Sequence, residues 1–526
     1  MAAASWDRRQ VLSGLGLGGL GFALTGCKTA PPQVVPKCIV PGPASWRRID
    51  AHVHVFNGTD LQIAGFLSKC VAYEYDWAKG FLQLIAQPLQ DFVWANSPLA
   101  KDERDHLDRI VWTERGLSVL ASSVFLEQIA RDQDKTAQQY SQFLGEQFRR
   151  DNVRQAAAEM AWEKSGRKTV RPPQFSDPGS PEKARKLAEG IDGKLGIPLF
   201  DYLGRYFNYR YANMYELAAS FACDRIEPID SFVSLMVDFD QPLGAGGETR
   251  SPIKDQCDVM SKIATLWEGR LLVLAPYCPL KDARQSGKSW ANVHYAWGLP
   301  GFVGAKMYPP MGFMPHGNGQ LADGKAVDAA LEAFYGECVK CDAVVMAHAG
   351  SSLCVGGKPC EMPGPGGWGD ALSWVHTNLK ASLRAGLGHF GHPFGTTEDS
   401  SKWPGMFADL MKLPGGERLY ADLSYASEIL KGSNNQPYVT RLASLLHDHP
   451  VLAERLMYGT DWLMVTIESG WKNYEHRMKA LADAVEKQAA VPGFSGRLFG
   501  GNARAWLGLD KPDSLAARNT AALLHQ

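Results

Sequence analysis

Ile49-Asp50-Ala51-His52-Val53-His54-Val55-Phe56 is a stretch in which apolar residues alternate with one aspartate and two histidines. A period of two is typical of a β-strand, where residues i and i+2 share a face. We therefore expect His52 and His54 to point the same way. Neutral imidazole is a common ligand of zinc and similar cations. The pair predicts either two polar residues of a structural strand or two ligands of one metal ion.

The whole chain has the composition of an ordinary globular protein. It contains 526 residues, of which 45% are hydrophobic and 21% charged, and its formal net charge is -1. This length suffices for one large domain with insertions or for two or three domains. The charge balance predicts no nucleic-acid partner and no binding to an anionic membrane surface, and it leaves the oligomeric state undetermined.

The N-terminal residues 1–27 have the features of an export signal. Arg8-Arg9 precedes the apolar, glycine-rich run 11–23, which resembles a twin-arginine signal and is too short to span a bilayer stably. Leu24-Thr25-Gly26-Cys27 resembles a bacterial lipobox, with Cys27 as the lipid-attachment residue. A plain N-terminal helix is the alternative. We expect an exported protein, lipid-anchored to a bacterial membrane and facing the periplasm, with the proline-rich residues 28–46 as a tether.

Residues 57–228 lack a clear strand pattern and are predicted to form a helical insertion after the first strand. Helical patterns occupy residues 106–132, 137–164, 181–194 and 201–223. The last of these is rich in tyrosine and arginine. This composition predicts either a packed core helix or a lid that contributes side chains to a pocket.

Seven further apolar runs follow the insertion and alternate with amphipathic helical stretches. They occupy residues 231–239, 271–275, 302–308, 343–347, 385–390, 419–423 and 455–458. Strands that alternate with helices predict parallel β/α units. With the first strand they number eight, which predicts a (β/α)8 TIM-type barrel built from residues 47–56 and 229–512. A doubly wound open sheet is the alternative, but no Gly-rich nucleotide loop follows an early strand.

Polar residues lie where several of these strands end. Lys306 and His389 lie near the end of an apolar run, and His348 and Asp461 follow one. Active sites of such barrels lie at the C-terminal ends of the strands. These four side chains therefore join the two histidines of the first strand as candidate site residues.

The cysteines carry less information than the histidines. Cys354 and Cys360 lie in one loop and are close enough in sequence for a local disulfide. Cys338 and Cys341 form a C-x-x-C pair, but no second pair follows, which argues against a structural zinc site.

The strand-end motifs together resemble the amidohydrolase superfamily, in particular its amidohydrolase-related group of metal-dependent hydrolases and some decarboxylases. The motifs are Asp50-Ala51-His52-Val53-His54, Met346-Ala347-His348-Ala349-Gly350, Leu387-Gly388-His389-Phe390-Gly391 and Gly459-Thr460-Asp461-Trp462, and residues 501–509 resemble the closing helix of the family. The resemblance covers the first strand and about residues 230–510, and the insertion lies outside it.

The resemblance implies that His52, His54 and His348 are metal ligands and that Asp461 is a further ligand and the proton acceptor. Three imidazoles and a carboxylate suit a divalent cation, with zinc as the default and manganese as the alternative. We expect one ion rather than two. Such an ion can lower the pKa of a bound water to around 7, which makes hydrolysis possible at neutral pH.

Three further positions receive roles from the same resemblance. His389 matches a histidine that acts beside the metal as a second catalytic group or ligand. His392 stands where the family commonly has glycine, so it either reaches the site or lies in the loop. Lys306 either bridges two metals as a carbamate, as in some binuclear relatives, or binds an anionic group of the substrate.

We expect a metal-dependent hydrolase that cleaves an amide, ester or lactone bond of a small molecule. A metal-dependent non-oxidative decarboxylase with the same ligands is the first alternative. A non-catalytic barrel lipoprotein is the second, but all four candidate ligands are present.

Overall fold

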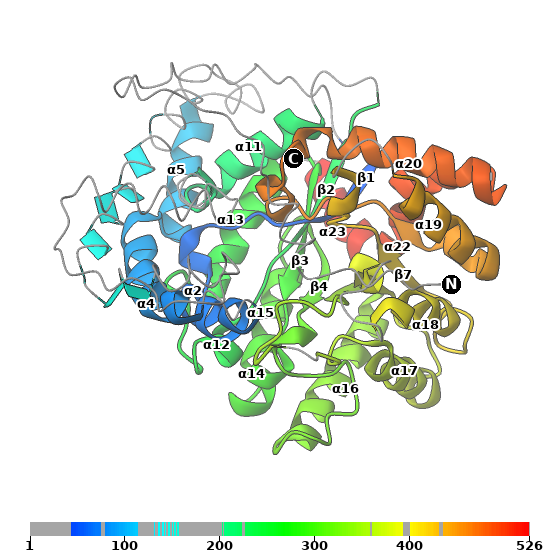
Figure 1. The fold of residues 1–526 in the computed structure, drawn as a ribbon, viewed down its shortest axis with the longest axis horizontal. Coiled ribbons are helices and arrows are strands. Elements are labelled where there is room, and N and C mark those ends of the chain that lie inside the picture. Colours follow the sequence, from blue (N-terminus) through cyan, green and yellow to red (C-terminus); the bar gives the residue numbers. More distant parts are fainter. Residues whose placement is uncertain are drawn as a thin grey trace, which may run out of the picture.

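Eight short strands form one parallel sheet in the order β1 to β8, with helices between them (Figure 1). The strands are β1 (Ile49–Val53), β2 (Ser231–Leu235), β3 (Leu271–Pro276), β4 (Phe302–Met307), β5 (Val344–His348), β6 (Ala385–Gly388), β7 (Leu419–Asp422) and β8 (Leu456–Met457). The computed structural model describes residues 44–74, 79–113, short pieces between 131 and 156, residue 202, and residues 205–222, 227–357, 360–392, 400–430 and 435–524.

The sheet closes on itself because β1 also bonds the segment that follows β8. The amide of Ala51 donates to the carbonyl of Tyr458 at 2.9 Å, and the amide of His54 donates to the carbonyl of Trp462 at 2.7 Å. Each other neighbouring pair of strands is parallel. The predicted TIM-type barrel is confirmed.

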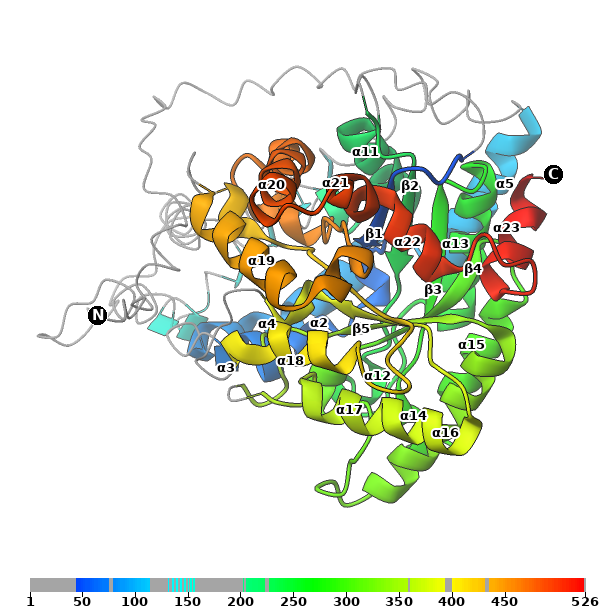
Figure 2. The same ribbon diagram turned by 90° about the vertical axis from the view of Figure 1, so that its right-hand side faces the viewer.

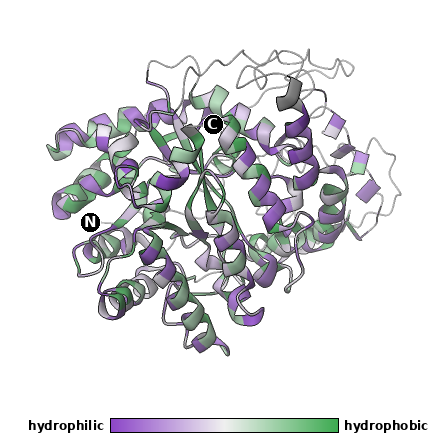
Figure 3. Cartoon of the chain, turned by 180° about the vertical axis from the view of Figure 1, so that it is seen from behind, coloured by the Kyte–Doolittle hydropathy of each residue, from purple (hydrophilic) through white to green (hydrophobic). Residues whose placement is uncertain are grey.

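Helices surround the strands, as Figure 2 shows from the side. The main ones after β2 are α13 (Ile253–Leu266), α14 (Pro279–Arg284), α15 (Lys288–Trp297), α16 (Gly324–Cys341), α17 (Pro365–Trp374), α18 (Trp403–Leu410), α19 (Gln436–Asp448), α20 (Tyr474–Ala489), α22 (Asn502–Leu507) and α23 (Leu515–Leu524). Apolar residues gather in the central strands, and polar ones lie on the outer faces of the helices (Figure 3). This is the pattern expected when each helix buries one stripe against the sheet.

The described residues between β1 and β2 form helices rather than strands. They are α2 (Ile63–Phe66), α3 (Ala72–Glu74), α4 (Lys79–Asn96), α5 (Ala100–Thr113) and α11 (Arg210–Phe221). Helices α2, α4 and α5 lie together on one side of the barrel, at the left of Figure 1. The predicted helix 181–194 and most of 114–164 lie outside the described residues, as does the predicted export signal 1–27. Within the described ranges, no helix combines the length and the apolar character needed to cross a membrane.

Helix α22, which precedes the last helix α23, lies at the amino end of the barrel. The side-chain amide of Asn502 donates to the carbonyl of Leu456, at the start of β8, at 2.7 Å. A Cβ on Gly500 would lie 1.8 Å from the carbonyl oxygen of Arg47, which precedes β1, so the chain approaches this end closely. Trp506 is fully buried in an apolar cluster with residues of several strands, including Leu272 and Met346.

Most strand bounds differ from the predicted ones by one or two residues, and the ends of β1 and β2 differ by more. β2 ends at Leu235 rather than at residue 239, because the following segment leaves the sheet and starts the short helix α12 (Asp240–Leu243). β6 ends at Gly388 rather than at residue 390, because His389 and Phe390 have φ angles of 68° and 45°. Positive φ cannot continue a strand.

The structure also answers the cysteine predictions. Cys354 and Cys360 form a disulfide in the loop after β5. Cys338 and Cys341 are free thiols near the end of α16.

Candidate metal centre

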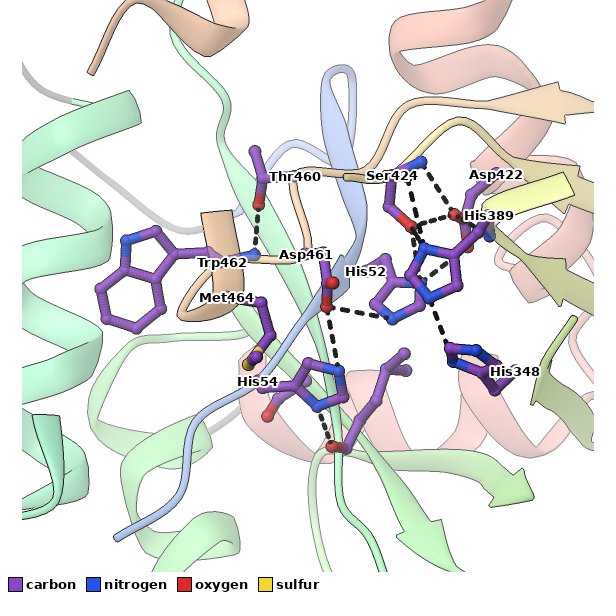
Figure 4. Close-up of polar contacts among 12 residues, drawn as sticks. His52, His54, His348, His389, Asp422, Ser424, Thr460, Asp461, Trp462 and Met464 are labelled. Atoms are coloured by element: carbon purple, nitrogen blue, oxygen red, sulfur yellow. Dashed lines mark hydrogen bonds and ion pairs between the residues drawn. The ribbon is translucent and has the colours of Figure 1, made fainter. Parts of the chain in front are cut away.

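Three predicted ligands converge at the carboxyl end of the barrel (Figure 4). His52 lies in β1, His54 directly follows it, and Asp461 follows β8. The Asp461 oxygen Oδ1 lies 3.2 Å from His54 Nε2 and 3.6 Å from His52 Nε2. Because β1 bonds the segment after β8, barrel closure brings residues from the two ends of the chain into this group.

In both His52 and His54, the ring nitrogen that points away from Asp461, Nδ1, has its own hydrogen-bond partner. His54 Nδ1 donates to the carbonyl oxygen of Leu235 at 2.9 Å, and His52 Nδ1 lies 2.9 Å from Asp422 Oδ2. Since a carbonyl oxygen and a carboxylate only accept, both Nδ1 atoms carry the proton. Each Nε2 therefore presents a lone pair toward Asp461, which is the tautomer that a metal ligand requires.

Several atoms of this centre are buried without a hydrogen-bond partner. Among the described residues, none hydrogen-bonds His52 Nε2 or Asp461 Oδ1. Buried polar atoms are normally satisfied, so an unsatisfied cluster of acceptors indicates that another group belongs there. Two imidazole nitrogens and one carboxylate oxygen are ligands of divalent zinc or manganese, and the residues present therefore fit such an ion.

The electrostatics keep these ligands ready to bind a cation. Burial lowers the pKa of His52, although Asp422 opposes this. Burial alone would raise the pKa of Asp461, but His54, His52 and His389 together hold it below its usual range. The imidazole of His52 is thus neutral and the carboxylate of Asp461 is ionised at neutral pH. These are the protonation states in which the two side chains bind metals.

Two glycines give His52 its space. A Cβ on Gly388 would lie 2.9 Å from His52 Cε1, and a Cβ on Gly459 would lie 2.9 Å from His52 Cβ. These contacts explain why glycine stands at positions 388 and 459, just before His389 and before Thr460-Asp461. Asp461 itself has φ 56°, and left-handed backbone in a non-glycine residue often occurs at functional sites.

The loop that carries Asp461 is tied to β1 by a second aspartate. Thr460 donates its hydroxyl to Asp50 at 2.7 Å and its amide to the same carboxylate at 3.0 Å. Burial raises the pKa of Asp50 to about 7, despite these bonds. Asp50 is therefore part of the support for Asp461.

Asp422 is a site residue that the sequence analysis did not single out. It is fully buried at the end of β7 and, with His52 and His389, forms a second group that could hold a metal. Both of its oxygens already accept: Oδ2 from His52, and Oδ1 from the amides of His389 and Ser424 at 2.9 and 3.0 Å. We assign it to orienting His52. A polar residue ending an apolar strand was the signal that could have revealed it.

His348 and His389 lie beside the three-residue group and contact each other. His389 Nε2 lies 3.2 Å from His348 Nδ1, and its Nδ1 lies 2.9 Å from the hydroxyl of Ser424. His348 Nε2 is buried and has no hydrogen-bond partner in the described ranges. Burial lowers the pKa of His389 to about 3, so this imidazole is neutral. The structure pairs His348 with His389, and the role of His348 as a metal ligand stays a prediction.

The two remaining predicted residues also lie at this end of the barrel. Lys306 is 1% exposed, and within the described part of the chain its amino group has no hydrogen-bond partner. Burial lowers the pKa of this amino group to about 8, against the opposing effect of Asp422 and Asp461. The His392 ring stacks on His389, with ring centroids 5.5 Å apart. Lys306 and His392 therefore lie near the candidate ligands, but their roles stay predictions.

Comparison with known proteins gives a limited result. No family model matches the chain, and no curated protein matches it. Among solved structures, an amidohydrolase from Burkholderia multivorans with bound zinc matches with a TM-score of 0.35 and 16% identity over 53% of this chain and 84% of that chain. A probable 2-pyrone-4,6-dicarboxylic acid hydrolase from Acinetobacter baumannii with citric acid bound matches with a TM-score of 0.29 and 12% identity over 53% and 84% of the two chains. Similarity at this level does not by itself assign a family.

Proposed function

We propose that the chain is a metal-dependent hydrolase of the amidohydrolase type, which cleaves an amide, ester or lactone bond of a small molecule. The observation that carries this proposal is the convergence of two imidazole nitrogens, His52 Nε2 and His54 Nε2, within 3.6 Å of one carboxylate oxygen, Asp461 Oδ1. These atoms lie at the end of the barrel where catalytic residues of this fold are found.

The candidate ligands are His52, His54 and Asp461, with His348 as the fourth. A divalent ion, zinc by default or manganese, supplies Lewis acidity that makes water nucleophilic at neutral pH. One ion per chain suits the group of unsatisfied ligand atoms that the described residues form around Asp461. With Lys306 protonated and unbridged, its amino group is available to an anionic part of the substrate.

The side chains of the site perform the proton transfers. Asp461 is ionised at neutral pH, so it can accept the proton of the attacking water and then pass it to the leaving group. His389 is neutral and tied to Ser424, so it can orient the water or donate to the developing oxyanion. Asp422 keeps His52 in the required tautomer.

A non-oxidative decarboxylase is the second candidate, and Lys306 favours it. Loss of CO2 from an acid requires a group that binds the carboxylate, and Lys306 offers a buried amino group without a hydrogen-bond partner in the described part of the chain. Product analysis separates the two reactions, because a hydrolase of esters or lactones releases no CO2 from its substrate.

The test uses metal-stripped protein, restored with zinc or with manganese, and measures hydrolysis of 4-nitrophenyl acetate and of dihydrocoumarin. We expect activity only in the restored protein and its loss in Asp461→Asn. The control is Asp483→Asn on α20, whose side chain is 52% exposed and pairs with Lys479. Equal hydrolysis by the stripped protein, or by Asp461→Asn, would reject the proposed function.

We also propose that the protein is exported and lipid-anchored through Cys27. This proposal rests on the twin-arginine and lipobox motifs alone. It implies that a small-molecule substrate is met outside the inner membrane.

A further inference from the structure

Three aromatic residues of the insertion, Tyr202, Tyr206 and Phe207, lie against the two strand exits that carry the metal centre. We call them the aromatic cap. The Phe207 ring packs edge-on against Phe56 at 5.7 Å, and Phe56 lies 6.4 Å from the His54 ring. The Tyr206 ring packs edge-on against Trp462, the neighbour of Asp461, at 5.6 Å. The cap therefore contacts Phe56, close to His54 in the chain, and Trp462, next to Asp461.

Backbone and side-chain bonds fix the cap to the exit of β1. The side-chain amide of Asn213 donates to the carbonyls of Phe56 and Tyr206 at 2.9 and 2.8 Å. The amide of Gly58 donates to the carbonyl of Phe207 at 3.1 Å. These bonds join the insertion to the residues that directly follow His54.

A buried ion pair cluster strengthens this attachment. Arg210 is fully buried and pairs with Asp60, just after β1, and with Glu103 of α5. The Glu103 carboxylate also accepts the amide of Tyr211 at 3.0 Å. The start of α11, which directly follows the cap, is thus held in one place relative to the barrel.

The Tyr202 hydroxyl has a weak partner. It donates to the thioether sulfur of Met464 at 3.7 Å, and Met464 lies three residues after Asp461. Thioether sulfur is a poor acceptor, so the O–H group remains available to a better one. Burial raises the pKa of Tyr202, and Tyr206 and Asp461 raise it further, which keeps the phenol a donor.

The three ligand side chains differ in how much of their surface is exposed. The side chains of His54 and Asp461 are each 10% exposed, whereas that of His52 is 1% exposed. The aromatic cap packs beside His54 and Asp461, which are the two more exposed ligands.

We propose that the insertion supplies Tyr202 as a substrate-binding residue, which donates a hydrogen bond to a carbonyl or carboxylate oxygen of the substrate beside Asp461. This inference rests on the proposed function and deepens it. The insertion then determines which acceptor-bearing small molecules bind, while the barrel supplies the ligands and the proton acceptor. Phe207 and Tyr206 hold the phenol in position by packing on its ring, at 6.1 and 5.2 Å.

The test compares Tyr202→Phe with wild type in the zinc-loaded full chain. The control is Tyr209→Phe, a tyrosine of the same insertion whose ring stacks on Tyr211 at 4.9 Å. Three quantities are measured: zinc per chain, the dissociation constant of acetohydroxamate by calorimetry, and kcat and KM for 4-nitrophenyl acetate. Acetohydroxamate is a small metal-binding probe that carries oxygen acceptors.

We expect Tyr202→Phe to keep its zinc and its melting temperature. Its dissociation constant for acetohydroxamate and its KM should rise roughly three- to tenfold, the usual effect of one lost neutral hydrogen bond. Tyr209→Phe should stay within about twofold of wild type, since its hydroxyl is given no role in binding.

Values for Tyr202→Phe within twofold of wild type, in protein that binds zinc and hydrolyses the ester, would overturn the inference and leave the proposed function intact. Wild-type protein that binds no zinc, or that neither hydrolyses the ester nor binds acetohydroxamate, would reject the proposed function and the inference with it.

Discussion

Replacing Lys306 by methionine should stabilise the metal-free protein. The amino group is buried at the end of β4, and no residue in the described ranges hydrogen-bonds it. Methionine has a similar length and flexibility and carries no charge, so it can occupy the same space without the cost of burying an ammonium group.

The pKa of Lys306 gives the size of the effect. Burial lowers this pKa from 10.5 to about 8. Each pKa unit corresponds to about 1.4 kcal/mol, so the protonated lysine costs about 3 kcal/mol of stability at pH 7. Because the folded state releases its proton more easily than the unfolded state, this cost is complete below pH 8. It decreases as the pH rises from about 8 to 10.5.

The assay is urea denaturation of metal-stripped protein at pH 7 and at pH 10. We expect Lys306→Met to exceed wild type by about 2 to 3 kcal/mol in the free energy of unfolding at pH 7. The difference should be much smaller at pH 10. A variant that is less stable than wild type at pH 7, or a difference that does not change with pH, would refute this reasoning.

The chain contains a matched control in Lys281, which is also 1% exposed. Its amino group pairs with Asp238 at 2.9 Å and Asp240 at 2.8 Å. Burial alone would lower the pKa of Lys281, but the two carboxylates raise it overall. Lys281→Met leaves two buried carboxylates unpaired, so it should lower the free energy of unfolding by roughly 3 to 5 kcal/mol. The two substitutions should therefore have opposite signs.

Three other substitutions test separate parts of the account. Asp422→Asn should weaken zinc affinity roughly 10- to 100-fold in a chelator competition, because His52 loses its charged partner, and an unchanged affinity would contradict the orienting role. Arg210→Met should lower the free energy of unfolding in urea by roughly 3 to 5 kcal/mol, because two buried carboxylates lose their partner, and a loss below about 1 kcal/mol would argue against it. Cys27→Ser should move the protein from the detergent phase to the aqueous phase in a phase-partition assay, and continued partition into detergent would exclude the lipid anchor.

The barrel and three residues of its site could be predicted because their signals are local. A strand that alternates with a helix shows its period within a few residues, and a polar residue at the end of an apolar run marks the catalytic edge. Strand pairing then decides which of these residues meet. His54 and Asp461 are far apart in the sequence and come together because β1 closes the barrel against the segment after β8.

Other features depend on contacts that leave no local pattern. Asp422 has the same position on its strand as His348, but only the structure shows that its oxygens are occupied by His52 and His389. The partner of His348 likewise depends on side-chain orientation, which the sequence does not encode at any fixed spacing. Tyr202 contacts Met464 because the insertion returns along the exit of β1, and long-range bonds such as those of Asn213 determine that path.

The most direct test of the central claim is the metal content per chain of the purified protein, grown with zinc and manganese supplied and compared with a His52→Ala/His54→Ala double variant. We predict one ion per chain in the wild type and none in the double variant. Two ions would contradict the mononuclear site and favour a carbamylated, bridging Lys306. No bound metal in the wild type would contradict the metal centre itself and favour a barrel lipoprotein that binds without catalysis.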